Sequence, residues 1–374
     1  MLSANRFGFH GPQAASAASL RFFPFLENAG SLLSFNLTME GIQMTPFAKL
    51  LYPLIAIALG FILDMLFGDP EGFPHPVMLI GKLIEALEKL FRKWFPKSRG
   101  GEIAAGGVMF FLVALICFAV PAGLLWLCYS LTPILGVAVE ALMCWQILAT
   151  KSLRDACMKV FRALKRGNVA KARHYVSRIV GRDTENLDES GIIRASVETA
   201  AENTCDGSVA PLIFLVIGGA PLGWLYKAVN TMDSMVGYVD EPYKNFGLIP
   251  ARADDVFNFL PARISALLML ISGFILNFNV SNGWKIFKRD RYNHKSPNSG
   301  QTESVCAGLL GIQLGGSASY RGIVHMKKTI GDPIRSIEPK DIDRSCKLLY
   351  NTALLSAVLF IGIRLALALA LLPR

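Results

Sequence analysis

Residues 106–131 read GGVMFFLVALICFAVPAGLLWLCYSL, an apolar run without a single charged side chain. As a helix, this run is long enough to span the roughly 30 Å of hydrocarbon in a bilayer. Residues 348–372 form a similar run, and across the chain 52% of residues are hydrophobic while only 18% are charged. Soluble domains usually carry about 25% charged residues. We therefore predict an all-α fold, that of a polytopic integral membrane protein.

The apolar runs predict four spans, at residues 47–67, 103–129, 131–149 and 348–372. Two further apolar segments, 211–225 and 264–278, are shorter than the roughly 20 residues that a span requires, so each either crosses the membrane or re-enters. Asp64 and Arg364 are among the charged residues that fall within spans. Asp64, one turn from the end of its span, is expected to reach the interface, and Arg364 either snorkels or pairs inside the bundle.

The formal net charge of +10 comes from basic residues beside apolar runs, which indicates membrane orientation rather than a nucleic-acid partner. Residues 82–99 repeat apolar side chains at helical spacing, a pattern typical of a helix on a membrane surface. The positive-inside rule places 82–99 and 151–182 on the cytoplasmic side. We predict a multi-pass protein of the cell membrane whose polar, helical loops are mainly cytoplasmic.

Two domain assignments follow from composition. Residues 1–46 are rich in Ser, Ala, Gly and Phe without helical periodicity, so we expect a disordered N-terminal extension that carries no function. Residues 47–374 are expected to form a single membrane-embedded catalytic domain. The seven cysteines show no metal-ligand spacing and are expected to be reduced and structural.

The densest polar group recurs at intervals of four residues and consists of Arg194, Glu198, Glu202 and Asp206. On an α-helix this spacing places all four along one stripe. Carboxylates so close repel one another and require a cation, and Mg²⁺ is usually held by a few carboxylates together with substrate phosphates. The alternative is a solvated, salt-bridged helix face. The apolar segment that begins at Pro211 favours the metal, because charges without a function are costly there.

A second polar group could complete the metal shell. Asn230 to Ser234, and Asp254, Asp255 and Asn258, place oxygens three or four residues apart on a helix face. For Asp254 the alternative is a helix N-cap.

Two segments are candidate anion sites. Residues 296–300 read SPNSG and precede a predicted helix, with Asn298 and Gln301 at capping-box spacing. Helix N-termini attract phosphate, although a plain helix cap would have the same sequence. Arg178 and Arg182 flank a glycine and form either a second anion site or a basic surface loop.

His75 lies between two prolines and could serve as a base, although a lone histidine is more often structural. The sequence shows no P-loop, no dinucleotide-binding glycine motif and no Ser-His-Asp order.

Taken together, these motifs closely resemble the adenosylcobinamide-phosphate synthases of cobalamin biosynthesis. The resemblance covers about residues 50–332 and rests on these blocks, quoted by number: FGDP at 67–70, PHPV at 74–77, GRDT at 181–184, AEN at 201–203, GGAP at 218–221, NTMDSMVGY at 230–238, DD at 254–255, PAR at 261–263 and SPN at 296–298. One departure is clear. The family usually continues after SPN with Ala-Gly-Trp-Pro-Glu, whereas residues 299–303 of this chain read SGQTE.

The resemblance implies formation of an amide bond. Adenosylcobyric acid is joined through its free propionate to (R)-1-amino-2-propanol O-phosphate, with ATP consumed and Mg²⁺ required. The implied partners are these two substrates, the lipid bilayer and other membrane-bound enzymes of cobalamin assembly. A carboxylate must be activated before an amine can displace its oxygen, which is consistent with phosphorylation and a metal clamp.

Residue patterns and resemblance together assign candidate roles. The candidate metal ligands are Glu198, Glu202 and Asp206. The candidate catalytic residues are His75, Asp183, Asp233, Asp254 and Asp255. The candidate substrate- and phosphate-binding residues are Arg182, Arg194, Asn203, Asn230, Arg252, Asn258, Ser296 and Asn298. We expect these blocks to converge on one cytoplasmic-side pocket.

Two other functions compete with the ligase. A membrane transferase acting on diphosphate substrates should carry paired D-x-x-x-D motifs, which the sequence lacks. A non-catalytic membrane protein similar to β-lactamase-regulatory relatives is expected to lack the polar blocks that this chain retains. Whether the activated intermediate is an acyl phosphate or an acyl adenylate stays open.

Overall fold

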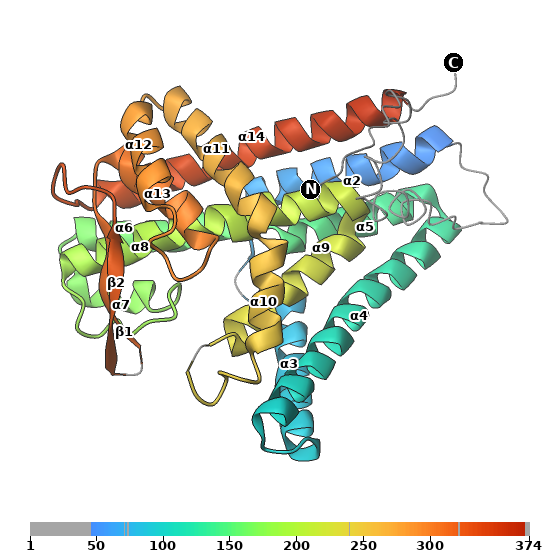
Figure 1. Ribbon diagram of the computed structural model, residues 1–374. Helices are drawn as coiled ribbons and strands as arrows, with labels where there is room; N and C mark the ends of the chain where they lie inside the picture. The colour runs from blue at the N-terminus through green and yellow to red at the C-terminus, as the bar shows by residue number, and fades with distance from the viewer. Residues whose placement is uncertain (1–45, 71, 73–74, 239, 321, 371–374) are drawn as a thin grey trace, which may run out of the picture. The chain divides into compact units, whose positions relative to one another are not determined.

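The computed structural model describes residues 46–370 apart from 71, 73–74, 239 and 321, all within one compact unit, Ile42–Arg374 (Figure 1). The expected N-terminal extension, 1–46, lies outside the described residues except for Pro46, where the first described helix begins. The described part is almost entirely helical, as predicted.

Five segments of the described chain are long and apolar enough to cross a membrane: Leu50–Phe67, Arg99–Leu131, Pro133–Lys165, Glu189–Val236 and Lys340–Ala370. Four of them overlap the four predicted spans. The short segment 211–225 belongs to the fourth of the five segments, and 264–278 overlaps a bent pair of helices that meet at 44° and would make a sixth span. The helices concerned are α2 (Pro46–Phe67), α4 (Arg99–Leu131), α5 (Pro133–Ile147), α9 (Ala210–Val236), α10 (Leu248–Phe257), α11 (Phe259–Ile275) and α14 (Lys340–Ala370). The amphipathic segment forms α3 (Pro76–Trp94).

One helical segment is much longer than a bilayer is thick. The helix α8 (Glu189–Thr204) continues through a π-helical turn, η1 (Cys205–Val209), into α9, a run of 48 residues that bends at Gly218 and Gly219. The 29 residues before the bend (189–217) alone measure about 44 Å at 1.5 Å per residue, more than the roughly 30 Å of hydrocarbon. Therefore α8 extends beyond the apolar layer, together with α6 (Thr150–Lys165), which continues from α5, and the start of α14.

These projecting ends pack with α7 (Val169–Val176), α12 (Val280–Asp290), α13 (Ser299–Leu310) and an antiparallel hairpin, β1 (Leu314–Tyr320) with β2 (Ile323–Ile330). We call this the polar region. Its apolar core includes Val160, Ile192 and Val305, whereas a second core around Val113 and Leu212 holds the spans together. The hairpin was not predicted from the sequence. A bulge with two glycines at positive φ, Gly315 and Gly316, interrupts its ladder.

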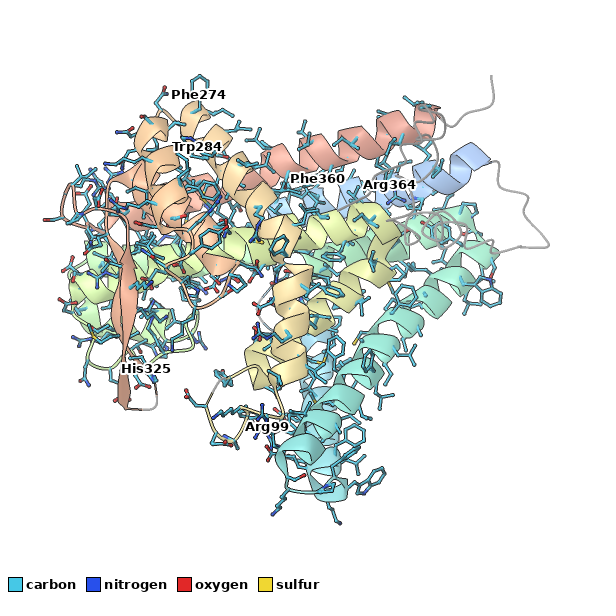
Figure 2. The ribbon with its side chains drawn as sticks, viewed as in Figure 1. Arg99, Phe274, Trp284, His325, Phe360 and Arg364 are labelled. Carbon is cyan, nitrogen blue, oxygen red and sulfur yellow. The ribbon has the colours of Figure 1, made fainter. Side chains whose placement is uncertain are left out.

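A break in α9 explains two charges within the spans. Gly218 and Gly219 leave the helical conformation, which frees backbone groups on both sides. On one side, Arg364 Nη1 donates to the carbonyls of Leu215 (3.3 Å) and Val216 (2.5 Å). On the other side, the Ala220 amide donates to Glu140 (3.3 Å). Arg364 therefore pairs inside the bundle, the second of the two predicted alternatives (Figure 2).

Asp64 also pairs inside the bundle, so the prediction that it reaches the interface is wrong. Its side chain is fully buried, and its Oδ2 accepts a hydrogen bond from the Thr150 amide at 3.1 Å. Thr150 is the first residue of α6, where a free amide and the helix dipole both stabilise a carboxylate.

Candidate active site

A group of carboxylates lies where the spans meet the polar region. We call it the acidic cluster, and its members are Glu202, Asp206, Asp233, Asp254 and Asp255. They come from α8, η1, α9 and α10, and each lies close enough to others in the cluster to be repelled by their charge. Residues far apart in the sequence thus form one strongly negative site.

The π-helical turn determines where Asp206 lies. An unbroken α-helix would place Asp206 on one stripe with Glu198 and Glu202, but the helix widens at Cys205 and shifts the residues that follow. The Asp206 carbonyl lies 3.3 Å from the Tyr226 hydroxyl. The predicted stripe is therefore interrupted at Asp206, which lies close enough to Asp233 and Asp254 to be repelled by their charges.

Asp254 is held in place by two side-chain amides. Its oxygens accept hydrogen bonds from Asn258 (3.0 Å) and Asn230 (3.3 Å). The Tyr226 hydroxyl in turn donates to Asn258 at 2.9 Å. Because Asp254 lies inside α10 rather than before it, the helix-cap alternative does not apply.

A lysine that the sequence analysis missed faces the acidic cluster. Lys227 lies on α9, where it interacts electrostatically with Asp69, Asp206 and Asp64. Its one sequence signal is a cation in an otherwise apolar stretch, LYKAV at 225–229. Lys227 therefore lies within the electrostatic reach of both Asp206 in the acidic cluster and Asp69 in the loop before α3.

His75 lies at that loop and caps α3. Its Nδ1 accepts a hydrogen bond from the Val77 amide at 3.2 Å, and its Nε2 lies 3.6 Å from Asp69 Oδ1. Burial lowers the pKa of His75, although Asp69 opposes the shift. The ring is therefore neutral at pH 7, with its proton on Nε2, because Nδ1 is an acceptor.

The SPNSG loop joins the acidic cluster to α13. Ser299 Oγ donates to Glu202 at 2.7 Å, and Asn298 Nδ2 donates to the Asp255 carbonyl at 2.8 Å. Ser296 Oγ accepts hydrogen bonds from the Asn298 and Ser299 amides at 3.2 and 3.3 Å. The predicted capping box is wrong, because Asn298 makes no capping hydrogen bond and its side-chain amide donates to the Asp255 carbonyl instead.

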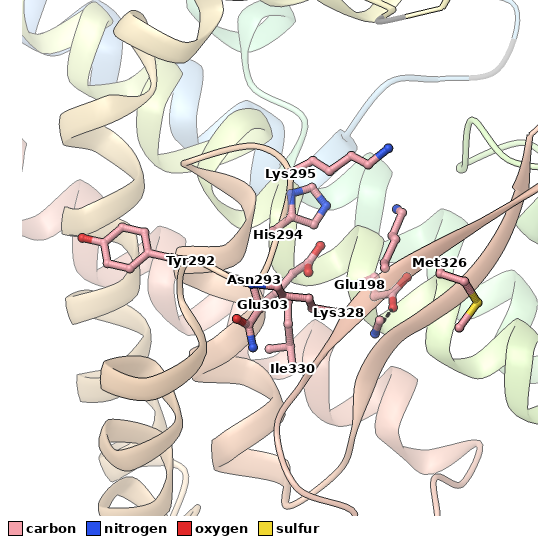
Figure 3. A pocket seen from close by; sticks show the side chains of 11 residues that line it. Glu198, Tyr292, Asn293, His294, Lys295, Glu303, Met326, Lys328 and Ile330 are labelled. Atoms are coloured by element: carbon pink, nitrogen blue, oxygen red, sulfur yellow. Dashed lines mark hydrogen bonds between the residues drawn. The ribbon is translucent and has the colours of Figure 1, made fainter.

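On the other side of this loop lies a cavity of about 280 Å³, which we call the α13 cavity (Figure 3). Its lining includes two carboxylates, Glu198 from α8 and Glu303 from α13. The remaining lining residues come from the loop before α13 and from the hairpin: Tyr292, Asn293, His294, Lys295, Gly315, Met326, Lys327, Lys328 and Ile330. Cations and carboxylates thus face the same small volume.

The two cavity carboxylates differ in their partners. Glu198 forms an ion pair with Arg182 and accepts a hydrogen bond from the Gly315 amide at 2.8 Å. Glu303 is only 4% exposed, and burial raises its pKa well above the usual range, with Glu198 and Glu202 adding to the shift. Lys327 and Arg182 oppose that shift only in part.

His294 lies beside Glu303 in the cavity wall (Figure 3). Burial lowers its pKa, and its Nδ1 accepts a hydrogen bond from the Ser296 amide at 3.0 Å. The neutral ring therefore carries its proton on Nε2 and can donate it. Neither His294 nor Glu303 was among the predicted site residues. The available signal was their closeness in sequence to the SPNSG block.

Asp183 lies apart from the acidic cluster, at the end of the hairpin. Its Oδ2 accepts hydrogen bonds from Ser319 Oγ (2.6 Å) and the Gly322 amide (2.7 Å). Its neighbour Arg182 forms an ion pair with Glu198, so residues 182–183 connect the hairpin to α8. The structure therefore places Asp183 against the hairpin and not among the residues that line the α13 cavity.

Three predicted binding residues lie at the edges of the site. Arg252 is 77% exposed and 3.6 Å from Asp255. Asn203 donates to a carbonyl of its own helix at 3.0 Å. Arg194 has a buried Nε without a hydrogen-bond partner among the described residues, and its charge acts on Asp188 at the start of α8.

The residues present suit Mg²⁺ by their chemistry. The acidic cluster offers only oxygen donors, and this ion commonly takes one or two protein carboxylates with waters and substrate phosphates. Among the residues that the structure describes, no group of three or more acidic, histidine or cysteine side chains is close enough to hold a metal alone. The donor set therefore fits a metal shared with a phosphorylated substrate rather than a closed protein cage.

Comparison with known proteins gives the family. The model of the CobD/Cbib protein family matches residues 57–349, which is most of the chain. The chain belongs to this family. It is 47% identical over 311 residues to the cobalamin biosynthesis protein CobD of Clostridium perfringens, covering 83% of this chain and 98% of the relative. The CobD protein of Klebsiella pneumoniae is 45% identical (83% and 97% covered) and the CbiB protein of Salmonella typhi 44% identical (84% and 98% covered).

No solved structure matches this CobD/Cbib chain. The family match includes the acidic cluster and the α13 cavity, because both lie between residues 57 and 349. Similarity to the relatives therefore extends over the whole candidate site.

Proposed function

We propose that this protein acts in cobalamin biosynthesis as an ATP-dependent amide ligase of the cell membrane. It would join (R)-1-amino-2-propanol O-phosphate to the free propionate of adenosylcobyric acid and yield adenosylcobinamide phosphate. Support comes from the CobD/Cbib family match and from relatives named as cobalamin biosynthesis proteins. The spans and the basic loops support a site that opens on the cytoplasmic side.

The observation that carries this proposal is the direct connection between the two charged sites. Glu202 belongs to the acidic cluster, and its partner Ser299 begins α13, which also carries Glu303 into the cavity. A ligase must hold a nucleotide phosphate near a carboxylate and an amine, so it requires a cation site beside an anion site. The SPNSG loop separates the two by only a few residues.

The reaction forms one C–N bond and removes one propionate oxygen. That oxygen leaves on a phosphorus atom of ATP, while the ammonium of the amine gives up two protons, one of them to the departing phosphate and the other to solvent or a protein base. Mg²⁺ would neutralise the phosphate charge that develops. Glu202 and Asp206 are the proposed magnesium ligands, with Glu198 nearby, and Asn230 and Asn258 keep Asp254 oriented toward them.

The proposed roles of the other residues follow from their contacts. Asp233 and Asp255 complete the negative site, whereas Arg182, Ser296 and Asn298 lie toward the phosphate side. His75 and Lys227 lie on the far side of the acidic cluster, toward α3. The corrinoid is far larger than a cavity of about 280 Å³ and must bind outside it.

The proposal is tested with the full-length protein purified in detergent. We expect adenosylcobyric acid, aminopropanol phosphate and MgATP to give adenosylcobinamide phosphate, with one ADP or AMP released per amide. The nucleotide product distinguishes an acyl phosphate from an acyl adenylate. A folded protein that neither forms the amide nor consumes ATP would contradict the proposal. In a deletion strain, adenosylcobyric acid should accumulate.

A further inference from the structure

The α13 cavity contains a buried carboxylate without a bonded partner. Glu303 is 4% exposed, and no hydrogen bond engages its carboxylate among the described residues. Every residue of α13 is buried, so the helix cannot swing to bring Glu303 to solvent. Burying an ionised group without a partner is costly. That cost raises the pKa of Glu303, and a cation in the cavity would favour its ionised form.

Glu198 does not have the same need. Both of its oxygens already accept hydrogen bonds, one from Arg182 and one from the Gly315 amide. The contrast between two carboxylates in one cavity identifies Glu303 as the group that faces a ligand. Figure 3 shows its carboxylate beside His294 and below Lys295.

Other residues that line the cavity suit an anion. Lys295 and Lys328 are exposed and make no ion pair within the described chain. His294 adds a neutral Nε2–H donor, and Asn293 adds a side-chain amide. Ammonium and imidazole donors together are typical of phosphate binding.

The size of the cavity restricts the ligand further. Pockets for drug-sized molecules measure about 300–1,000 Å³. At about 280 Å³, this cavity suits a molecule of roughly ten heavy atoms rather than a nucleotide or a corrinoid. The ligand should therefore be small and carry a positive and a negative end.

We propose that the α13 cavity binds a small amino phosphate zwitterion, with its ammonium on Glu303 and its phosphate on Lys295, Lys328 and His294. Naming this ligand as the amine substrate, aminopropanol phosphate, rests on the proposed function. The binding site itself rests only on the cavity, its charges and its size.

Calorimetry on the detergent-purified protein, in EDTA and without ATP, tests the site directly. The probes are aminopropanol phosphate, O-phosphoethanolamine, 1-amino-2-propanol and inorganic phosphate. We expect the two zwitterions to bind at least tenfold more tightly than either half alone. Glu303→Gln should weaken the zwitterions by tenfold or more and leave inorganic phosphate within about twofold. Glu85→Gln, the same change on the exposed face of α3, should alter nothing.

Lys328→Ala provides a second test that does not depend on a buried position. Lys328 is exposed, so this variant should fold normally and lose affinity for inorganic phosphate and both zwitterions but not for 1-amino-2-propanol. Unchanged zwitterion affinity in Glu303→Gln or in Lys328→Ala would overturn the proposal. So would zwitterion binding that occurs only when Mg²⁺ replaces EDTA, because Glu303 would then serve a metal.

The outcome is separable from that of the proposed function. If the zwitterion binds as expected but no amide forms with adenosylcobyric acid, the cavity assignment stands and the ligase proposal fails. If the amide forms at the same KM for the amine in wild type and Glu303→Gln, the ligase stands and the cavity assignment fails.

Discussion

Buried charges occur in two regions of this protein, and their surroundings differ. At the break in α9, Glu140 accepts hydrogen bonds from Tyr129 (2.6 Å) and Ala220 (3.3 Å), while Arg364 donates to two freed carbonyls. In the polar region and where it meets the spans, Glu303 and the acidic cluster have more carboxylates than protein partners. The first region satisfies its charges internally, and the second does not.

The difference separates structural charges from functional ones. A spanning helix that loses backbone hydrogen bonds at a glycine pair must replace them, since hydrocarbon provides none. Glu140 and Arg364 do this and leave no group for a ligand. Carboxylates that repel one another at the membrane boundary have no such internal explanation, so we attribute them to binding. Three substitutions test this distinction, described in order of decreasing effect.

Arg364→Met should cause the largest loss. It removes both donors to the broken helix and leaves Glu140 without a cation, and breaking a buried pair typically costs about 3–5 kcal/mol. We expect a lower thermal midpoint in detergent and poor membrane yield. If the two charges act as a pair, the double variant Arg364→Met with Glu140→Gln should recover part of the loss. A single variant as stable as wild type would show that water or lipid satisfies the break.

Glu202→Gln should come next, affecting activity rather than stability. Removing one ligand from a metal site shared with phosphate should lower turnover about a hundredfold, equivalent to about 2.7 kcal/mol of transition-state stabilisation. Added MgCl₂ should restore part of it, and the thermal midpoint should stay near that of wild type. The exposed Glu85→Gln is the matched control.

Near-normal turnover of folded Glu202→Gln at low Mg²⁺ would contradict the metal role of this residue. Its interaction with Ser299 would then be structural. Substitutions of Asp233, Asp254 and Asp255 should in that case give the larger defects.

The spans could be predicted from the sequence because hydrocarbon thickness fixes the length of an apolar run. The polar blocks were also visible, since charges are rare beside such runs. The π-helical turn was not visible in the sequence. The hydroxyl that donates to the Asp206 carbonyl belongs to Tyr226, which lies 20 positions later in the chain. The glycine pair at 218–219 indicated a break in α9. The side chains that bond to the freed backbone groups, Glu140 and Arg364, lie on other helices and could not be predicted.

The hairpin and the α13 cavity were missed for a related reason. Residues 314–320 read LGGSASY, with little β propensity, and two isolated strands are marginal without support. The support comes from Glu198 and Asp183, more than 100 positions earlier in the chain. Such long-range contacts leave no periodic signal, so nothing in the sequence marked Glu303 as part of the wall of a cavity.

Substitution of Asp290, a buried carboxylate that has protein partners, should give the smallest effect. Asp290 lies in the polar region and is 4% exposed, as Glu303 is, but its oxygens accept hydrogen bonds from Arg289 (2.7 and 2.8 Å) and the Gly331 amide (2.7 Å). The Arg289 hydrogen bond, together with the Gly331 amide, lowers the pKa of Asp290. Its stabilising contribution is therefore complete above the unfolded pKa of about 3.9 and is lost as the pH falls through the lower folded value.

Asp290→Asn should cost about 1 kcal/mol at pH 7, because Arg289 is half exposed and its pairing is screened by solvent. The difference in free energy of unfolding between wild type and variant should shrink below about pH 4, and amide exchange at Gly331 should quicken at pH 7. Binding of amino phosphates should not change. If Asp290→Asn weakened that binding as much as Glu303→Gln, having a full set of partners would no longer distinguish a structural carboxylate from a ligand-binding one.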